Sequence, residues 1–139
     1  MYKTILVTLD GTKTDRAIVE HIKPLALMMG SRITLLHVAD GWAARLFGPD
    51  AVSPEVSDDR AYLENVRAGF TAAGIPAETA LAFGEPAREI VRWVRQNRCD
   101  LVAMSTHGHR FLGDLFLGST ARQVRHSIST PLLLVRGER

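Results

Sequence analysis

A glycine-bearing segment late in the chain carries residue types that bind phosphate groups. Gly108 and Gly118 are separated by nine residues, and the hydroxyl side chains of Ser119 and Thr120 follow directly. Glycine has no Cβ atom, so its backbone can approach an anion closely, and the hydroxyls can donate hydrogen bonds. The spacing predicts a loop that holds phosphate groups, although an ordinary capped connection would use the same residue types.

Other polar side chains in this segment could take part. Arg110 could form a fork of hydrogen bonds with a phosphate group. His109 could contact the same group, whereas His107 could equally support the loop. Two histidines two residues apart could also suggest a metal ion, but no third ligand is evident, so we expect no metal site.

The segment joins a strand to a helix. Leu101–Met104 is an apolar run of strand length, and helical spacing of apolar residues begins at Ala121. The first turn of a helix leaves backbone N–H groups unpaired, and the helix dipole adds a positive end there, so anions are favoured. Ser119 is a preferred residue type for the N-cap, so we expect the helix to begin just after it.

Apolar runs alternate with helical patterns along all 139 residues. The predicted strands are Lys3–Leu9, Arg32–Val38, Pro76–Phe83, Leu101–Met104 and Leu132–Val135. The predicted helices begin near Thr14, cover Asp58–Ala73, begin near Pro86, and run from Ala121. This alternation predicts a single α/β domain over residues 1–139, with a five-stranded parallel open sheet and helices on both faces, as in Rossmann-like folds. The third strand alternates only weakly, which is typical of a sheet edge.

The carboxyl ends of parallel strands meet at one edge of the sheet, where open α/β folds bind ligands. Asp10 ends the first strand, Val38 ends the second, and the segment from Ser105 follows the fourth. We expect a crevice between the first and fourth strands. Nearby, Thr14 can cap the first helix, and Asp15 would stand in its first turn, where a negative charge is favoured.

Two further features have a structural interpretation. His37 lies within an apolar strand, where we expect it to pack in the core or at its edge. Gly41–Asp58 contains turn residues together with Trp42, Leu46 and Phe47, which are too apolar for a free linker. A short helical turn or flap over the sheet edge is one prediction for this segment, and a surface loop is the other.

Composition narrows the classes of function. The net charge is +2 with basic and acidic residues interleaved, so no nucleic-acid partner is expected. Cys99 is the only cysteine, which excludes an intrachain disulfide. The chain begins without a signal-peptide pattern, and no apolar run approaches the roughly 20 residues of a membrane span. We therefore expect a cytoplasmic protein without a membrane partner.

Five signatures, in this order, resemble the universal stress protein family over essentially the whole chain. They are Lys3–Thr12, Leu35–Val38, Gly84–Ala87, the spaced pair Gly108 and Gly118 with its hydroxyls, and Pro131–Val135. The nucleotide-binding branch of that family carries Gly-x-x-Gly, nine residues, and then Gly followed by Ser or Thr. Ser105 stands where the first of these glycines usually does, and Thr8 stands where the family commonly has a proline.

The resemblance implies binding of ATP, ADP or AMP, with Mg²⁺ on the phosphates. It implies that Asp10 lies by the ribose or adenine and that Val38 offers its backbone to the adenine edge. The implied phosphate contacts are Gly108, His109 and Arg110 from one side, and Gly118, Ser119 and Thr120 from the other. Thr8, Ser105 and His107 complete the candidate site. The resemblance also implies a homodimer that pairs the last strand, Leu132–Val135, across a two-fold axis.

Three functions remain open from the sequence. The first is a regulatory, stress-response protein that binds an adenine nucleotide. The second is a slow ATPase or phosphotransferase, suggested by Asp10 and the two histidines, although no nucleophile with an adjacent base and no P-loop lysine is evident. The third is a nucleotide-free interaction module, which the serine at position 105 would favour.

Overall fold

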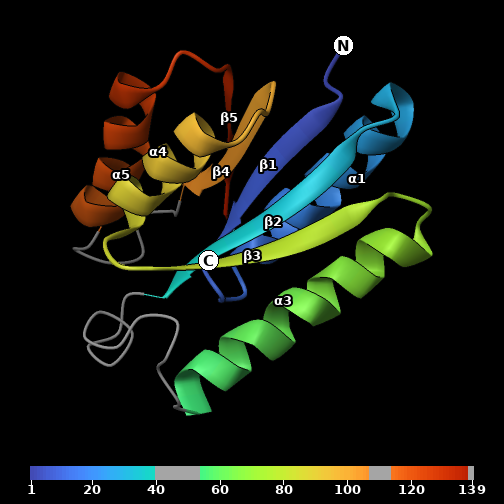
Figure 1. Ribbon diagram of the computed structural model, residues 1–139, viewed down its shortest axis with the longest axis horizontal. Coiled ribbons are helices and arrows are strands. Elements are labelled where there is room, and N and C mark those ends of the chain that lie inside the picture. The colour runs from blue at the N-terminus through green and yellow to red at the C-terminus, as the bar shows by residue number, and fades with distance from the viewer. Residues whose placement is uncertain (40–53, 107–113, 138–139) are drawn as a thin grey trace.

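The computed structural model describes residues 1–39, 54–106 and 114–137, which form a parallel sheet flanked by helices (Figure 1). The five strands lie in the order β3-β2-β1-β4-β5, and all their pairings are parallel. The strands are β1 (Thr4–Leu9), β2 (Arg32–Ala39), β3 (Ala77–Phe83), β4 (Leu101–Thr106) and β5 (Leu132–Arg136). The helices are α1 (Asp15–Met29), α3 (Pro54–Ala72), α4 (Pro86–Gln96) and α5 (Asp114–Ser127). The predicted α/β fold with its five-stranded parallel sheet is confirmed.

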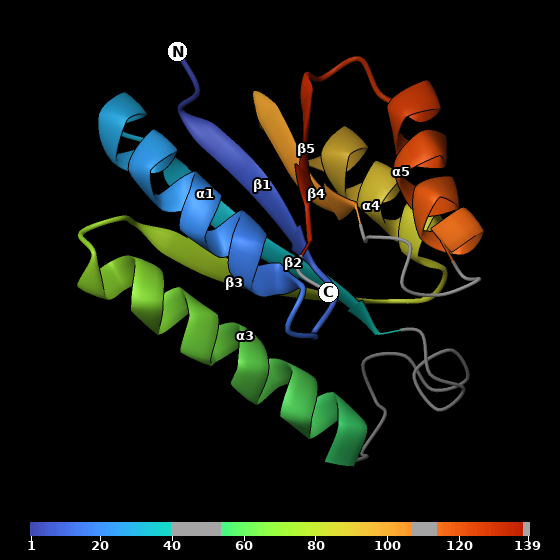
Figure 2. The ribbon, with the colours of Figure 1, turned by 180° about the vertical axis from the view of Figure 1, so that it is seen from behind.

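Two apolar cores lie on opposite faces of the sheet, because successive strand residues point to opposite sides. Ile5 and Val7 of β1 are fully buried in a core shared with α1 and α3. Leu6, between them, lies in a second core shared with α4 and α5. Both views show α4 beside α5 near β4 and β5, and α3 running along β3 (Figures 1 and 2). The central strands are therefore covered on both faces, which explains their unbroken apolar sequences.

The two edges of the sheet are β3 and β5. The prediction that the third strand lies at an edge is confirmed. At the other edge, Leu134 of β5 is 45% exposed, an unusual fraction for a leucine in a strand of this sheet. Among the described helices, none is long and apolar enough to cross a membrane.

The first turns of three helices show how the local sequence determines where each helix begins. At α4, Pro86 occupies the first turn, and the side chain of Glu85 accepts hydrogen bonds from two amides of that turn. Helix α3 begins at Pro54, earlier than the predicted start at Asp58, since proline is well suited to a first helical turn. Thr14 is the N-cap of α1, but its side chain makes no capping hydrogen bond, so the capping role predicted for it is wrong. Its Oγ1 lies 2.6 Å from Thr12 Oγ1 instead.

Helix α5 begins earlier than the sequence suggested. It starts at Asp114, so Gly118, Ser119 and Thr120 lie inside the helix, and Ser119 is not its N-cap. A glycine within a helix costs only about 1 kcal/mol relative to alanine, which tertiary packing can offset. Val124 of the same helix is fully buried in the second core and anchors it to the sheet.

The remaining predictions about elements concern the segment Gly41–Asp58. Its last five residues, 54–58, belong to α3. Residues 41–53, with the proposed flap or loop, lie outside the described residues.

Candidate functional site

A pocket of about 410 Å³ lies at the carboxyl ends of the central strands. This volume falls within the usual range for small-ligand sites, about 300–1,000 Å³. The lining residues come from three strand ends and two helices. They are Thr8, Leu9, Asp10, Leu36, His37, Val38, Glu85, Pro86, Ile90, Met104, Ser105, Ser119, Thr120 and Gln123.

The sheet topology explains why the pocket forms here. Strand β1 pairs with β2 on one side and with β4 on the other. From β1 the strand order runs outward through β2 and β3 in one direction, and through β4 and β5 in the other. The connections that follow β1 and β4 lead to α1 and α5, which pack on opposite faces of the sheet, and a crevice opens between such connections. The predicted crevice between the first and fourth strands is therefore present.

The pocket gathers part of the candidate site. Thr8, Asp10, Val38, Ser105, Ser119 and Thr120 all line it. Gly118 lies one residue before Ser119 in α5. His107, Gly108, His109 and Arg110 lie outside the described residues.

Ser105 is distinctive among the lining residues. Its Oγ is buried from solvent and has no hydrogen-bond partner among the described residues. A buried hydroxyl without a partner costs roughly 1–3 kcal/mol, so such groups are rare in folded proteins and call for an explanation. In a pocket wall, a bound molecule can supply the missing partner.

Charge in the pocket comes from carboxylates. Asp10 and Glu85 both line it, whereas none of the described lining residues is a lysine or an arginine. The carboxylate of Glu85 accepts from the first amides of α4, so its charge is engaged there. Carboxylate oxygens accept hydrogen bonds, which suits the hydroxyl groups of a sugar. The described residues contain no group of three or more potential metal ligands.

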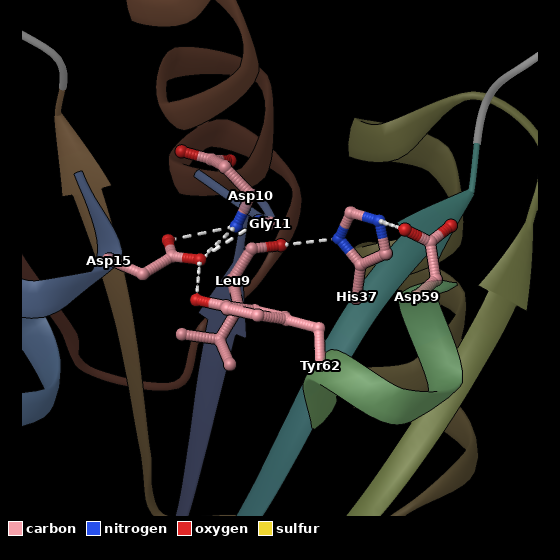
Figure 3. Close-up of polar contacts among 7 residues, drawn as sticks. All are labelled: Leu9, Asp10, Gly11, Asp15, His37, Asp59 and Tyr62. Atoms are coloured by element: carbon pink, nitrogen blue, oxygen red, sulfur yellow. Dashed lines mark hydrogen bonds and ion pairs between the residues drawn. The ribbon is translucent and has the colours of Figure 1, made fainter. Parts of the chain in front are cut away.

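Buried Asp15 organises the turn that carries Asp10 (Figure 3). Its side chain is 1% exposed and accepts hydrogen bonds from the amide of Asp10 at 2.9 Å and the amide of Gly11 at 2.8 Å. Gly11 adopts φ of +81°, a left-handed conformation that suits glycine. The hydroxyl of Tyr62 in α3 donates a third bond to Asp15, at 2.6 Å. The amides of Asp10 and Gly11 are thus bonded within the protein, so we do not count them among the donors for a ligand.

His37 takes part in the pocket wall as well as in the core. It is 9% exposed, as expected for a packed histidine, but it also lines the pocket. Its Nδ1 lies 2.8 Å from the carbonyl oxygen of Leu9, and its Nε2 lies 3.4 Å from Oδ1 of Asp59 (Figure 3). A carbonyl oxygen can only accept, so Nδ1 must carry a proton and donate it. The ring therefore connects the end of β1 to α3.

The chain belongs to the universal stress protein family, whose family model matches residues 1–136. A curated relative from Thermus aquaticus, named "Universal stress protein in QAH/OAS sulfhydrylase 3'region", is 33% identical over 141 residues. That match covers 98% of this chain and 100% of the relative.

Solved structures of similar fold agree with this assignment. The structure of MJ0577, a universal stress protein of Methanocaldococcus jannaschii, matches with a TM-score of 0.83 and 25% identity, covering 100% of this chain and 99% of that chain. A universal stress protein solved in complex with cAMP matches with a TM-score of 0.74 and 21% identity, covering 97% of each chain. The second likeness shows the shared fold alone.

Proposed function

We propose that this protein binds an adenine nucleotide in the pocket at the ends of β1, β2 and β4, and acts as a nucleotide-responsive regulatory protein. The observation that carries the proposal is the buried Oγ of Ser105, a residue of the pocket wall, because this hydroxyl has no partner among the described residues. A phosphate or sugar oxygen would accept its hydrogen bond and remove the desolvation penalty. A relative of the same fold was solved with cAMP, an adenine nucleotide.

The pocket suggests how the ligand lies. Val38 and Leu36 offer apolar surface and main-chain groups for the adenine ring, while Asp10 accepts hydrogen bonds from ribose hydroxyls. The phosphates then extend toward Ser105, Ser119 and Thr120, whose hydroxyls can donate to them.

The candidate phosphate contacts that follow β4 complete this proposal. Gly108, His109 and Arg110 would meet the phosphates from the side opposite Gly118, with His107 beside them. The ligands are ATP, ADP or AMP, and Mg²⁺ would accompany the longer phosphate chains.

Calorimetric titration with ATP, ADP and AMP, each with and without Mg²⁺, tests the proposal. The variant Ser119→Leu adds bulk to the pocket wall and should abolish or strongly weaken binding. Ser129→Leu is the matched control, because Ser129 is exposed, lies beyond α5 and does not line the pocket. Absence of binding by the unaltered protein would overturn the proposed function.

We also propose that the protein forms a homodimer through β5. This strand is a sheet edge with exposed Leu134, and an unpaired apolar edge favours pairing with another strand. Sedimentation should show a dimer that Leu134→Lys converts to a monomer. A monomeric unaltered protein at micromolar concentration would contradict the dimer without affecting the nucleotide site.

A further inference from the structure

Helix α3 contacts the pocket wall through two side chains one turn apart. Asp59 and Tyr62 both point from α3 toward the ends of β1 and β2 (Figure 3). Residues three apart share one face of a helix, so a single helix face supplies both contacts. The rest of this face packs on the apolar core through Leu63, Val66 and Phe70.

The first contact runs through Asp15. A carboxylate that is 1% exposed needs several hydrogen bonds to offset the cost of its burial. Tyr62 supplies one of them, and the amides of Asp10 and Gly11 supply the others. Loss of the Tyr62 hydroxyl would leave the carboxylate held only by the turn, so the position of Asp10 depends on α3.

The second contact runs through His37. Its imidazole lies between the carbonyl oxygen of Leu9 and the carboxylate of Asp59, at 2.8 Å and 3.4 Å. The side chains of His37 and Asp59 are 11% and 20% exposed, so this contact is largely shielded from water. Leu9 and His37 are also register partners in the β1–β2 ladder. The ring therefore ties two strand ends to the helix.

The residues held by these contacts are the pocket residues themselves. Leu9, Asp10 and His37 all line the pocket, and each is connected to α3: His37 directly, Leu9 through His37, and Asp10 through Asp15. We propose that Tyr62 and Asp59 are positioning residues for the nucleotide site, and that α3 is consequently coupled to ligand occupancy. This inference rests on the proposed function, because it concerns the same site.

Such coupling is reciprocal. If α3 holds Asp10 in the position that accepts a ribose hydroxyl, then a bound ribonucleotide must in turn stabilise the contacts of α3. Affinity and the local stability of the helix should therefore change together.

The test compares Tyr62→Phe with Tyr2→Phe, which removes a hydroxyl from a partly buried tyrosine of the same core, at the start of the chain. The affinities for AMP and for 2′-deoxy-AMP are measured for each protein. Tyr62→Phe should weaken AMP binding by about five- to tenfold, as expected for one misplaced hydrogen bond. It should weaken 2′-deoxy-AMP binding less, so that discrimination between the two ligands falls. Tyr2→Phe should leave both affinities unchanged.

Hydrogen exchange on the unaltered protein provides a second measurement. The affinity measurements are also repeated on a second variant. Saturating AMP should slow hydrogen exchange of amides in the first turns of α3, with little effect on the last turn of α4. Asp59→Asn should reproduce a smaller loss of discrimination. Unchanged affinities in both variants, with AMP still bound by the unaltered protein, would overturn this inference and leave the proposed function standing. Failure of the unaltered protein to bind any nucleotide would overturn both.

Discussion

The hydroxyl of Tyr62 donates to the buried carboxylate of Asp15 across 2.6 Å, although 47 residues separate them in the chain. The same carboxylate receives the amide of Asp10, so one acidic group joins α3, α1 and a turn in the pocket wall. Changes at Tyr62 or Asp15 should therefore affect both the stability of the protein and the position of this turn.

Alkaline pH should lower the stability of the folded protein through ionisation of Tyr62. Burial, and then the hydrogen bond to Asp15, raise the pKa of this phenol above its ordinary value of about 10. A group with a raised folded-state pKa contributes its stability below the unfolded-state pKa, and the contribution is lost as pH rises through the folded-state pKa. Urea unfolding should therefore show a loss of stability above pH about 10 that is smaller in Tyr62→Phe.

The control for this pH series is Tyr2→Phe, whose unfolding should follow the same pH dependence as the unaltered protein. An identical alkaline slope in Tyr62→Phe and the unaltered protein would show that the phenol does not contribute to it.

Replacement of the buried carboxylate should be costly. Asp15→Asn places an amide NH₂ group among three hydrogen-bond donors, so at least one of them loses its acceptor. The free energy of unfolding should fall by about 2–4 kcal/mol, as for other broken buried charge networks. The exposed Asp58→Asn near the start of α3 is the control and should change it by less than about 0.5 kcal/mol. Equal effects of the two substitutions would contradict the role given to Asp15.

Ser105→Ala should act in opposite directions on stability and on binding. The ligand-free protein should be equally stable or more stable, by up to about 1–2 kcal/mol, because an unpartnered buried hydroxyl is removed. Nucleotide affinity should fall by about five- to tenfold, because the bound ligand loses a donor. Thermal unfolding and calorimetry on the same sample measure both effects. Lower stability with unchanged affinity would show that the hydroxyl serves the fold alone.

Cys99 should react slowly with thiol reagents near neutral pH. Burial, with a smaller effect of the neighbouring Asp100, raises the pKa of its thiol to about 11. Only the thiolate is reactive, so the modification rate should rise about tenfold per pH unit up to that range. The same protein unfolded in urea should react as fast as a free cysteine, which provides the control. Rapid labelling of the folded protein at pH 7 would contradict this.

The fold could be predicted because its signals are local. Unbroken apolar runs such as Ile5–Val7 mark strands buried on both faces, and the alternation with helices leaves few possible topologies. The place of the pocket then follows from topology, since Asp10 follows β1 and Ser105 lies near the carboxyl end of β4, the two strands that flank the switch point.

Other features depend on side-chain orientation, strand register and packing, and could not be predicted from the sequence pattern. Asp15 stands in the first turn of α1, as predicted, but its carboxylate also turns back to the amides of Asp10 and Gly11. The sequence predicts that His37 packs in the core or at its edge, and its place beside the pocket depends on the register of β1 with β2. The early start of α5 places Gly118 inside the helix, where glycine costs only about 1 kcal/mol relative to alanine and so does not mark the helix start.

Neighbouring residues at the end of β1 face different partners. Thr8 and Leu9 both line the pocket, but only Leu9 also belongs to the core beneath α1 and α3. The contacts of this strand end with His37 and Asp15 are made by main-chain groups. The carbonyl oxygen of Leu9 accepts from His37, and the amide of Asp10 donates to Asp15. Every amino acid except proline carries both of these peptide groups, so the hydrogen bonds from this strand end to His37 and Asp15 do not depend on which other side chain stands at position 9 or 10.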